Sequence, residues 1–217
     1  MKQAVRAMLE DTLEVFAQKF TKPLAVWDKF IEFVAAQSRA SVFLELDHKF
    51  EWLFADLTFA RSVENTYDQT LLKSDYYDHL GELYSDLCQK ELGSGNRSSR
   101  PLPYSAVENI AKIGVETTQE CKRIFLPNAD TGRIIMAVHK QTPNAFLFAS
   151  EKDLRRYRIA YTNLCIHDIY AAIVHADYET HELDIATEAG RENWQFANRW
   201  SAQTDNLRLK APSIHAY

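Results

Sequence analysis

The stretch KRIFLPNADTGRIIMAVHK, residues 122–140, predicts a short strand, a tight turn and an amphipathic helix in succession. Two further short apolar runs follow it, with a second helical stretch between them. Strands that alternate with helices indicate βαβ crossovers and therefore a parallel sheet, here half of a doubly wound one. The expected strands are residues 124–126, 145–148 and 171–174, and the expected helices are residues 132–140 and 153–167.

The N-terminal part of the chain has a different pattern. From Gln3 to about Glu91, Gly and Pro are scarce and apolar residues recur every three or four positions, which predicts a helical bundle. Thr21, shortly before Pro23, is a candidate cap for the second helix. One group of aromatic residues is expected to pack in the core, with a base-stacking platform as the alternative: Phe43, Phe50, Trp52, Phe54 and Phe59.

Residues 93–103, GSGNRSSRPLP, form the clearest loop because Gly, Ser, Asn and Pro cluster there. This loop carries Arg97 and Arg100 without an acid of its own. It is either a flexible connector or a basic hook that touches a phosphate or a cofactor carboxylate. After it, Ser105 and Glu108 fit a capping box at the start of a helix. The expected organisation is a helical bundle domain over residues 1–92, a connecting loop over 93–103 and a truncated α/β domain over 104–217.

Composition limits the classes of function. The 217 residues, 46% of them hydrophobic, are enough for a substantial core. The formal charge of −5 argues against a general attraction for phosphate, so any contact with DNA would need a local patch. The three cysteines lack CxxC spacing, and no apolar run approaches about 18 residues, which predicts a cytoplasmic protein without membrane contact. The histidines show no ligand spacing and predict no metal site: His139, His167, His175 and His181.

Residues 75–113 resemble the junction between the helical and catalytic parts of the N-6 adenine DNA methyltransferase (N-6 DNA methylase) family. The matching pieces are Leu80-Gly81-Glu82-Leu83-Tyr84, the turn GSGNR at residues 93–97, and Pro103-Tyr104. The resemblance covers roughly residues 24–200. It implies a helical N-terminal domain followed by a partial Rossmann-like methyltransferase fold with a parallel sheet, of the kind that binds S-adenosylmethionine.

The same resemblance implies which residues would hold that cofactor. Pro127, Asp130 and Gly132 stand at the turn after the first strand, where the backbone passes close to the methionine part. Glu151 stands where an acid would hold the ribose hydroxyls, and Asp177 where an acid would contact the adenine.

Each acid also has a structural interpretation. Glu151 and Asp153 lie where the start of a helix favours acids and a cap, whatever the ligand. Asp177 fits an ordinary turn equally well.

Several of the family's functional residues are absent from this sequence. Leu126 stands in place of the leading acid of the turn, and Asp130 in place of its first glycine. The catalytic tetrapeptide Asn/Asp-Pro-Pro-Tyr/Phe, which would hold a flipped adenine, does not occur in the 217 residues. These losses argue against an enzyme and predict that no cofactor is bound, with S-adenosylmethionine as the candidate if one is.

Two functional hypotheses follow. The first is a non-catalytic methyltransferase-like scaffold or binding protein, linked to restriction-modification, anti-restriction or the regulation of a mobile element. The second is an S-adenosylmethionine-binding subunit of a DNA adenine methyltransferase that a partner chain completes. Half a sheet leaves an open strand edge, which predicts a homo-oligomer or a protein partner. A DNA contact through Arg97 and Arg100, joined by Arg155 and Arg156, is a third expectation.

Overall fold

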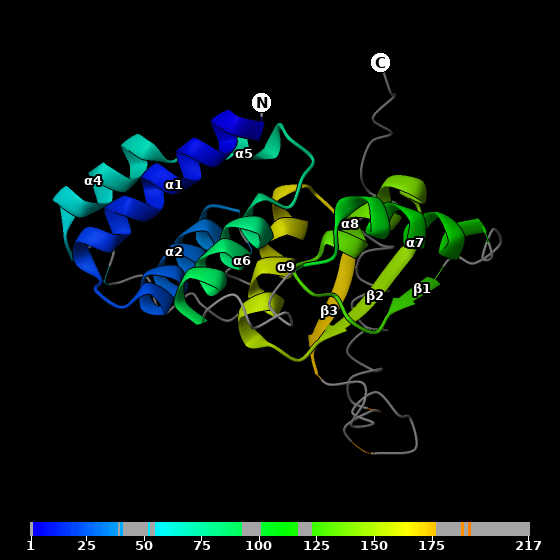
Figure 1. Ribbon diagram of the computed structural model, residues 1–217. Helices are drawn as coiled ribbons and strands as arrows, with labels where there is room; N and C mark the ends of the chain where they lie inside the picture. Colours follow the sequence, from blue (N-terminus) through cyan, green and yellow to red (C-terminus); the bar gives the residue numbers. More distant parts are fainter. Residues whose placement is uncertain are drawn as a thin grey trace, which may run out of the picture.

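The computed structural model describes residues 2–38, 40, 52, 55–92, 101–116, 123–176, 188 and 191. Two groups of elements lie side by side, helices in one and a sheet with its helices in the other (Figure 1). Within the described part of the chain, no helix combines the length and the apolarity needed to cross a bilayer. The elements, in chain order, are α1 (Lys2–Lys19), α2 (Pro23–Gln37), α4 (Leu57–Thr66), α5 (Gln69–Lys73), α6 (His79–Leu92), α7 (Tyr104–Glu116), β1 (Arg123–Leu126), α8 (Arg133–Gln141), β2 (Phe146–Glu151), α9 (Leu154–Ile166) and β3 (Ala171–His175).

The three described strands form one parallel sheet in the order β1-β2-β3. Ile124 pairs with Leu147, and Leu147 in turn with Ala171. Helix α8 connects the first two strands and α9 the last two, so each connection is a βαβ crossover. The predicted α/β fold with a parallel sheet, a partial Rossmann-like arrangement, is therefore confirmed, and each strand lies where its apolar run predicted.

The helical part has its own aromatic core. Phe16 of α1 lies at its centre, with ring centroids 5.8 Å from Phe30 and 5.3 Å from Phe59. Trp27 is fully buried and packs against Tyr84 of α6 at 5.2 Å. This confirms the predicted bundle. Trp52 and Phe59 belong to the core, as predicted, whereas Phe43, Phe50 and Phe54 lie outside the described residues.

Helix α9 joins the two parts of the molecule. One side of it contributes Ile159 and Ile166 to the core of the helical bundle. Another side contributes Ala160 and Leu164 to the core beneath the sheet. Figure 1 shows α9 between the bundle and the strands, with α7 and α8 beside the sheet. The two parts therefore pack on a shared helix.

Helix starts follow local chemistry, with two corrections to the sequence prediction. Asp153 caps α9 by accepting from the backbone N–H of Arg156, as predicted. Thr21 is not a cap, because α2 begins at Pro23 and Lys22 occupies the cap position. Ser105 is not a cap either. Helix α7 already begins at Tyr104, which places Ser105 inside its first turn.

Candidate functional site

The turn between β1 and α8 folds back onto the end of β2. The N–H of Ala129 donates to the carbonyl of Ser150 over 2.8 Å, and the hydroxyl of Ser150 donates to the carbonyl of Pro127, also over 2.8 Å. Ala129 is fully buried. Asp130 adopts a left-handed backbone with φ of 49°, a conformation that costs a non-glycine residue free energy. The turn is thus held against the strand end where the resemblance placed a nucleoside.

Glu151 lies at the centre of this contact. Its Oε2 accepts from the N–H of Asp130 over 2.8 Å, and its Oε1 accepts from the N–H of Asp153 over 2.8 Å. The residue is only 3% exposed. Burial raises the pKa of the Glu151 carboxyl, although the two amide donors and Arg156 act in the opposite direction. Each carboxylate oxygen therefore already holds one backbone amide, one from the turn and one from the start of α9.

Asp130 faces α9. One of its carboxylate oxygens lies 3.5 Å from Nη1 of Arg156. Burial raises the pKa of the Asp130 carboxyl despite this cation. The acid of this turn is therefore held within the protein by an ion pair.

Gly132 has a structural reason to be glycine. Its φ is +88° and it caps α8. A Cβ on this residue would lie 3.1 Å from the Cα and 3.3 Å from the carbonyl oxygen of Ala160. Close packing of α8 against α9 accounts for this glycine without a ligand.

A second set of polar residues lies behind the turn, around Asp78, whose side chain is fully buried. Its Oδ1 accepts from the N–H of Gly81 and from Nδ2 of Asn163, each over 2.7 Å. Its Oδ2 accepts from the hydroxyl of Thr131 and from Nε of Arg133. We call these five residues the Asp78 cluster. They come from the entrance and first turn of α6, the turn after β1, α8 and α9.

Arg133 extends this cluster toward α7. Its Nη1 donates to the carbonyl of Leu102 over 2.8 Å, and its guanidinium carbon lies 4.3 Å from the ring centroid of Tyr104. Its Nη2 is buried and lies 3.7 Å from Oε1 of Glu82 without a hydrogen bond among the described residues. Arg133 and the buried carboxylate of Asp78 stabilise this junction only while both are present.

The sequence predicted the residues of the turn and Glu151, but not the polar residues behind the turn. Pro127, Asp130, Gly132 and Glu151 do lie together at the end of β1 and β2. Asp177, Arg97 and Arg100 lie outside the described residues. The Asp78 cluster was not predicted. Its signal in the sequence is an acid three residues before a glycine, a spacing too common to indicate a buried cluster.

Two arginines of the expected basic patch are paired with acids. Arg155 binds Asp28 with two hydrogen bonds of 2.7 and 2.9 Å, and Arg156 pairs with Asp130. Both cations are therefore engaged with acids of the same chain. Among the residues that the structure describes, no group of three or more His, Cys, Asp or Glu could hold a metal ion.

Comparison with known proteins adds a distant likeness. Among solved structures, the chain is similar to a Listeria monocytogenes protein provisionally described as a class I S-adenosylmethionine-dependent methyltransferase, with a TM-score of 0.49 and 13% identity. The match covers 81% of this chain and 53% of the other, so this chain spans about half the length of that protein. No family model and no curated protein matches the sequence. A likeness this distant says nothing about cofactor or activity.

Proposed function

We propose that this chain is a non-catalytic, methyltransferase-like scaffold or binding protein whose former nucleoside site is closed by its own backbone. The observation that carries the proposal is the state of Glu151. Its two carboxylate oxygens accept from the amides of Asp130 and Asp153, and the side chain is 3% exposed. Each carboxylate oxygen could accept a second hydrogen bond, so the burial of the side chain beneath the turn is what keeps a ribose diol from the acid.

Moving the turn away from Glu151 would disturb more than one hydrogen bond. The turn is also fixed by the Ala129 and Ser150 bonds to the end of β2, and by the ion pair between Asp130 and Arg156. An amide buried without a partner costs about 1–3 kcal/mol. The nucleoside would therefore bind only after offsetting the loss of contacts that hold the turn closed.

A separate observation supports the proposal that this chain does not transfer methyl groups. The catalytic tetrapeptide Asn/Asp-Pro-Pro-Tyr/Phe does not occur in these 217 residues. Without this tetrapeptide, the sequence lacks the acceptors that the resemblance implies for the amine of a flipped adenine. We therefore place the protein's role in binding rather than in methyl transfer, in restriction-modification, anti-restriction or the regulation of a mobile element.

A protein partner or a second copy of the chain fits this role. Strand β1 is an edge of the described sheet and is only four residues long. Phe125 on this strand is 38% exposed and stacks on Phe148 of β2, with centroids 5.3 Å apart. An edge strand with an exposed aromatic residue favours association with another chain.

Titration calorimetry with S-adenosylmethionine tests the proposal. We expect no saturable binding at micromolar concentrations. Micromolar binding that is lost in Glu151→Gln but kept in the control Glu64→Gln, a change at an exposed residue on α4, would instead support the cofactor-binding subunit of a methyltransferase. In the same preparation, a gel shift that disappears on changing Arg97 and Arg100 to Ala would add DNA to the partners.

A further inference from the structure

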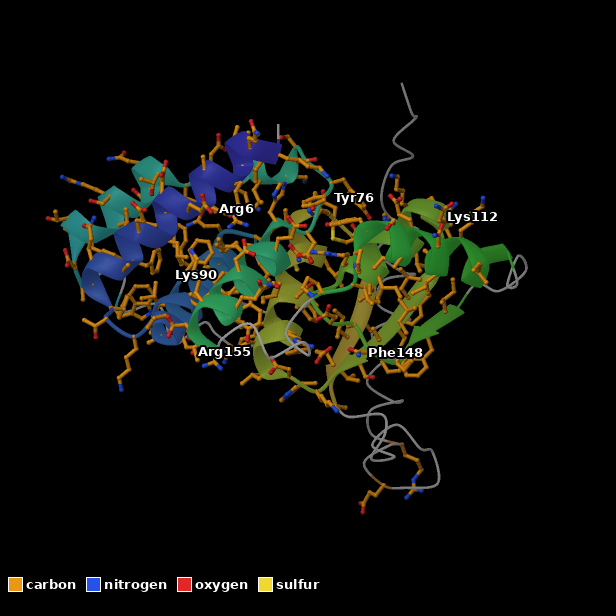
Figure 2. All side chains as sticks on the ribbon, viewed as in Figure 1. Arg6, Tyr76, Lys90, Lys112, Phe148 and Arg155 are labelled. Atoms are coloured by element: carbon orange, nitrogen blue, oxygen red, sulfur yellow. The ribbon has the colours of Figure 1, made fainter. Side chains whose placement is uncertain are left out.

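The structure contains a cavity that belongs neither to the turn nor to Glu151. It measures about 270 Å³ and lies between the start of α1, the segment before α6, α7 and α8. Figure 2 labels Tyr76, which lies near its wall between the helical bundle and α8. The residues that line the cavity are Lys2, Tyr76, Tyr77, Tyr104, Glu108, Arg133, Met136, Ala137 and Lys140.

The charges around this cavity are mostly positive in a chain whose net charge is negative. Lys2, Arg133 and Lys140 face a single acid, Glu108. Arg133 is already bound to Asp78 and therefore acts as the inner wall. The two lysines are exposed and are the cations left to contact a ligand.

Lys2 is held in place by aromatic rings. Its Nζ lies 3.5 Å from the centroid of the Tyr77 ring, and Tyr77 in turn stacks on Tyr104 at 4.2 Å with an angle of 14°. A ring face attracts an ammonium group but carries no net charge. Lys2 therefore lies beside the cavity in a position that the stacked rings restrict.

Tyr104 contributes to the wall of the cavity. Its hydroxyl accepts from the N–H of Asp78, so its own proton is not used in that bond. Burial raises the pKa of Tyr104, which keeps the hydroxyl protonated at any physiological pH. Two ammonium groups at one cavity suit a ligand with several strong acceptor oxygens.

We infer that this cavity binds the phosphate group of a small molecule, with Lys2 and Lys140 as the contacting cations. The volume exceeds what a phosphate alone needs, and Met136 and Ala137 provide an apolar wall for an attached organic group. Glu108 opposes binding because its carboxylate repels the ligand. This site is independent of the closed turn, and its existence does not depend on the proposed scaffold role.

The test is calorimetry in phosphate-free buffer with inorganic phosphate and phenyl phosphate as probes. We expect saturable binding of at least one probe, weakened about fivefold or more in Lys2→Ala and in Lys140→Ala. Lys112→Ala is the matched control, because Lys112 is an exposed lysine on α7 that does not line the cavity (Figure 2). Glu108→Gln should strengthen binding.

The two probes distinguish the source of the phosphate. Tighter binding of phenyl phosphate assigns the site to an organic phosphate, and equal affinity assigns it to the free ion. Absence of saturable binding by both probes would overturn the inference. Binding that Lys2→Ala and Lys140→Ala leave at the wild-type level, or that Lys112→Ala weakens equally, would also overturn it.

Discussion

Asn163 on α9 donates from Nδ2 to Oδ1 of Asp78 over 2.7 Å, although 85 residues separate the two in the sequence. The same amide group donates to the backbone carbonyl of Thr131 over 2.9 Å. One side chain thus connects the entrance of α6, the turn after β1 and the helix that both cores share. The position of the turn depends on this contact, which the apolar pattern alone does not reveal.

Replacing Asn163 by Ala should therefore destabilise the whole molecule. The change removes one donor from a fully buried carboxylate and leaves the Thr131 carbonyl without that partner. We expect a loss of about 2–4 kcal/mol in the free energy of unfolding, measured by urea denaturation. The control is Ser62→Ala, because the hydroxyl of Ser62 donates only within its own helix α4. It should change the free energy of unfolding by no more than about 0.5 kcal/mol. A similar small effect for Asn163→Ala would mean that the Asp78 cluster does not hold the turn.

Gly81→Ala should destabilise a helix that alanine normally favours. Alanine is better than glycine in a helix interior by about 1 kcal/mol. Here a Cβ would overlap both carboxylate oxygens of Asp78 and the hydroxyl of Thr131. We expect a loss of about 3 kcal/mol or more, seen as a lower midpoint of thermal unfolding. An unchanged or higher midpoint would show that Gly81 does not lie against Asp78.

His167 should make stability depend on pH. Burial lowers its pKa to about 4 in the folded state, from an ordinary value of 6.5. The folded protein therefore binds the proton less readily than the unfolded chain. The contribution of His167 to the free energy of unfolding is fully present above about pH 6.5 and is lost as pH falls toward 4.

Urea denaturation across this pH range measures the effect. Wild type should lose roughly 2 kcal/mol more than His167→Gln between pH 7 and pH 4, after allowance for partial exposure. Ser62→Ala, which removes no titrating group, is the control and should follow wild type. If the free energies of unfolding of wild type and His167→Gln change with pH in parallel, the imidazole of His167 is not buried in its neutral form.

Glu151 should show the opposite pH dependence. Burial raises its folded-state pKa above the ordinary value of 4.5, so its contribution to stability is present below that pH and is lost as pH rises through the folded pKa. Glu151→Gln cannot ionise and lacks this loss. The stability of wild type relative to Glu151→Gln should therefore decrease as pH rises above 4.5. Ser62→Ala, which removes no titrating group, should show no such trend. An increase of this relative stability with pH would contradict the burial of Glu151.

The sequence predicted the elements well because their causes are local. The strand predicted at residues 124–126 is Arg123–Leu126, and the helix predicted at 153–167 is Leu154–Ile166 with Asp153 as its cap. Short apolar runs between turn residues and a well-placed acid are sufficient for such predictions.

The contacts within the site could not be predicted in this way. The bonds from Glu151 to the Asp130 amide and from Asn163 to Asp78 join residues 21 and 85 positions apart. Sequence patterns show that an acid is present but not which donors reach it. Ribose binding and a structural role at the helix start both fit the sequence around Glu151, and only the tertiary packing of the turn gives that carboxylate its two amide partners.

The most direct test of the closed turn is the response of the Asp130 and Asp153 backbone amides to S-adenosylmethionine in ¹H–¹⁵N NMR spectra. Both amides donate to Glu151, so a cofactor that used this acid would have to change their environment. We predict that both resonances stay in place with the cofactor at about 1 mM, a concentration that would detect even millimolar affinity. Saturable shifts of both resonances, absent in Glu151→Gln, would contradict the closed turn and restore the cofactor site.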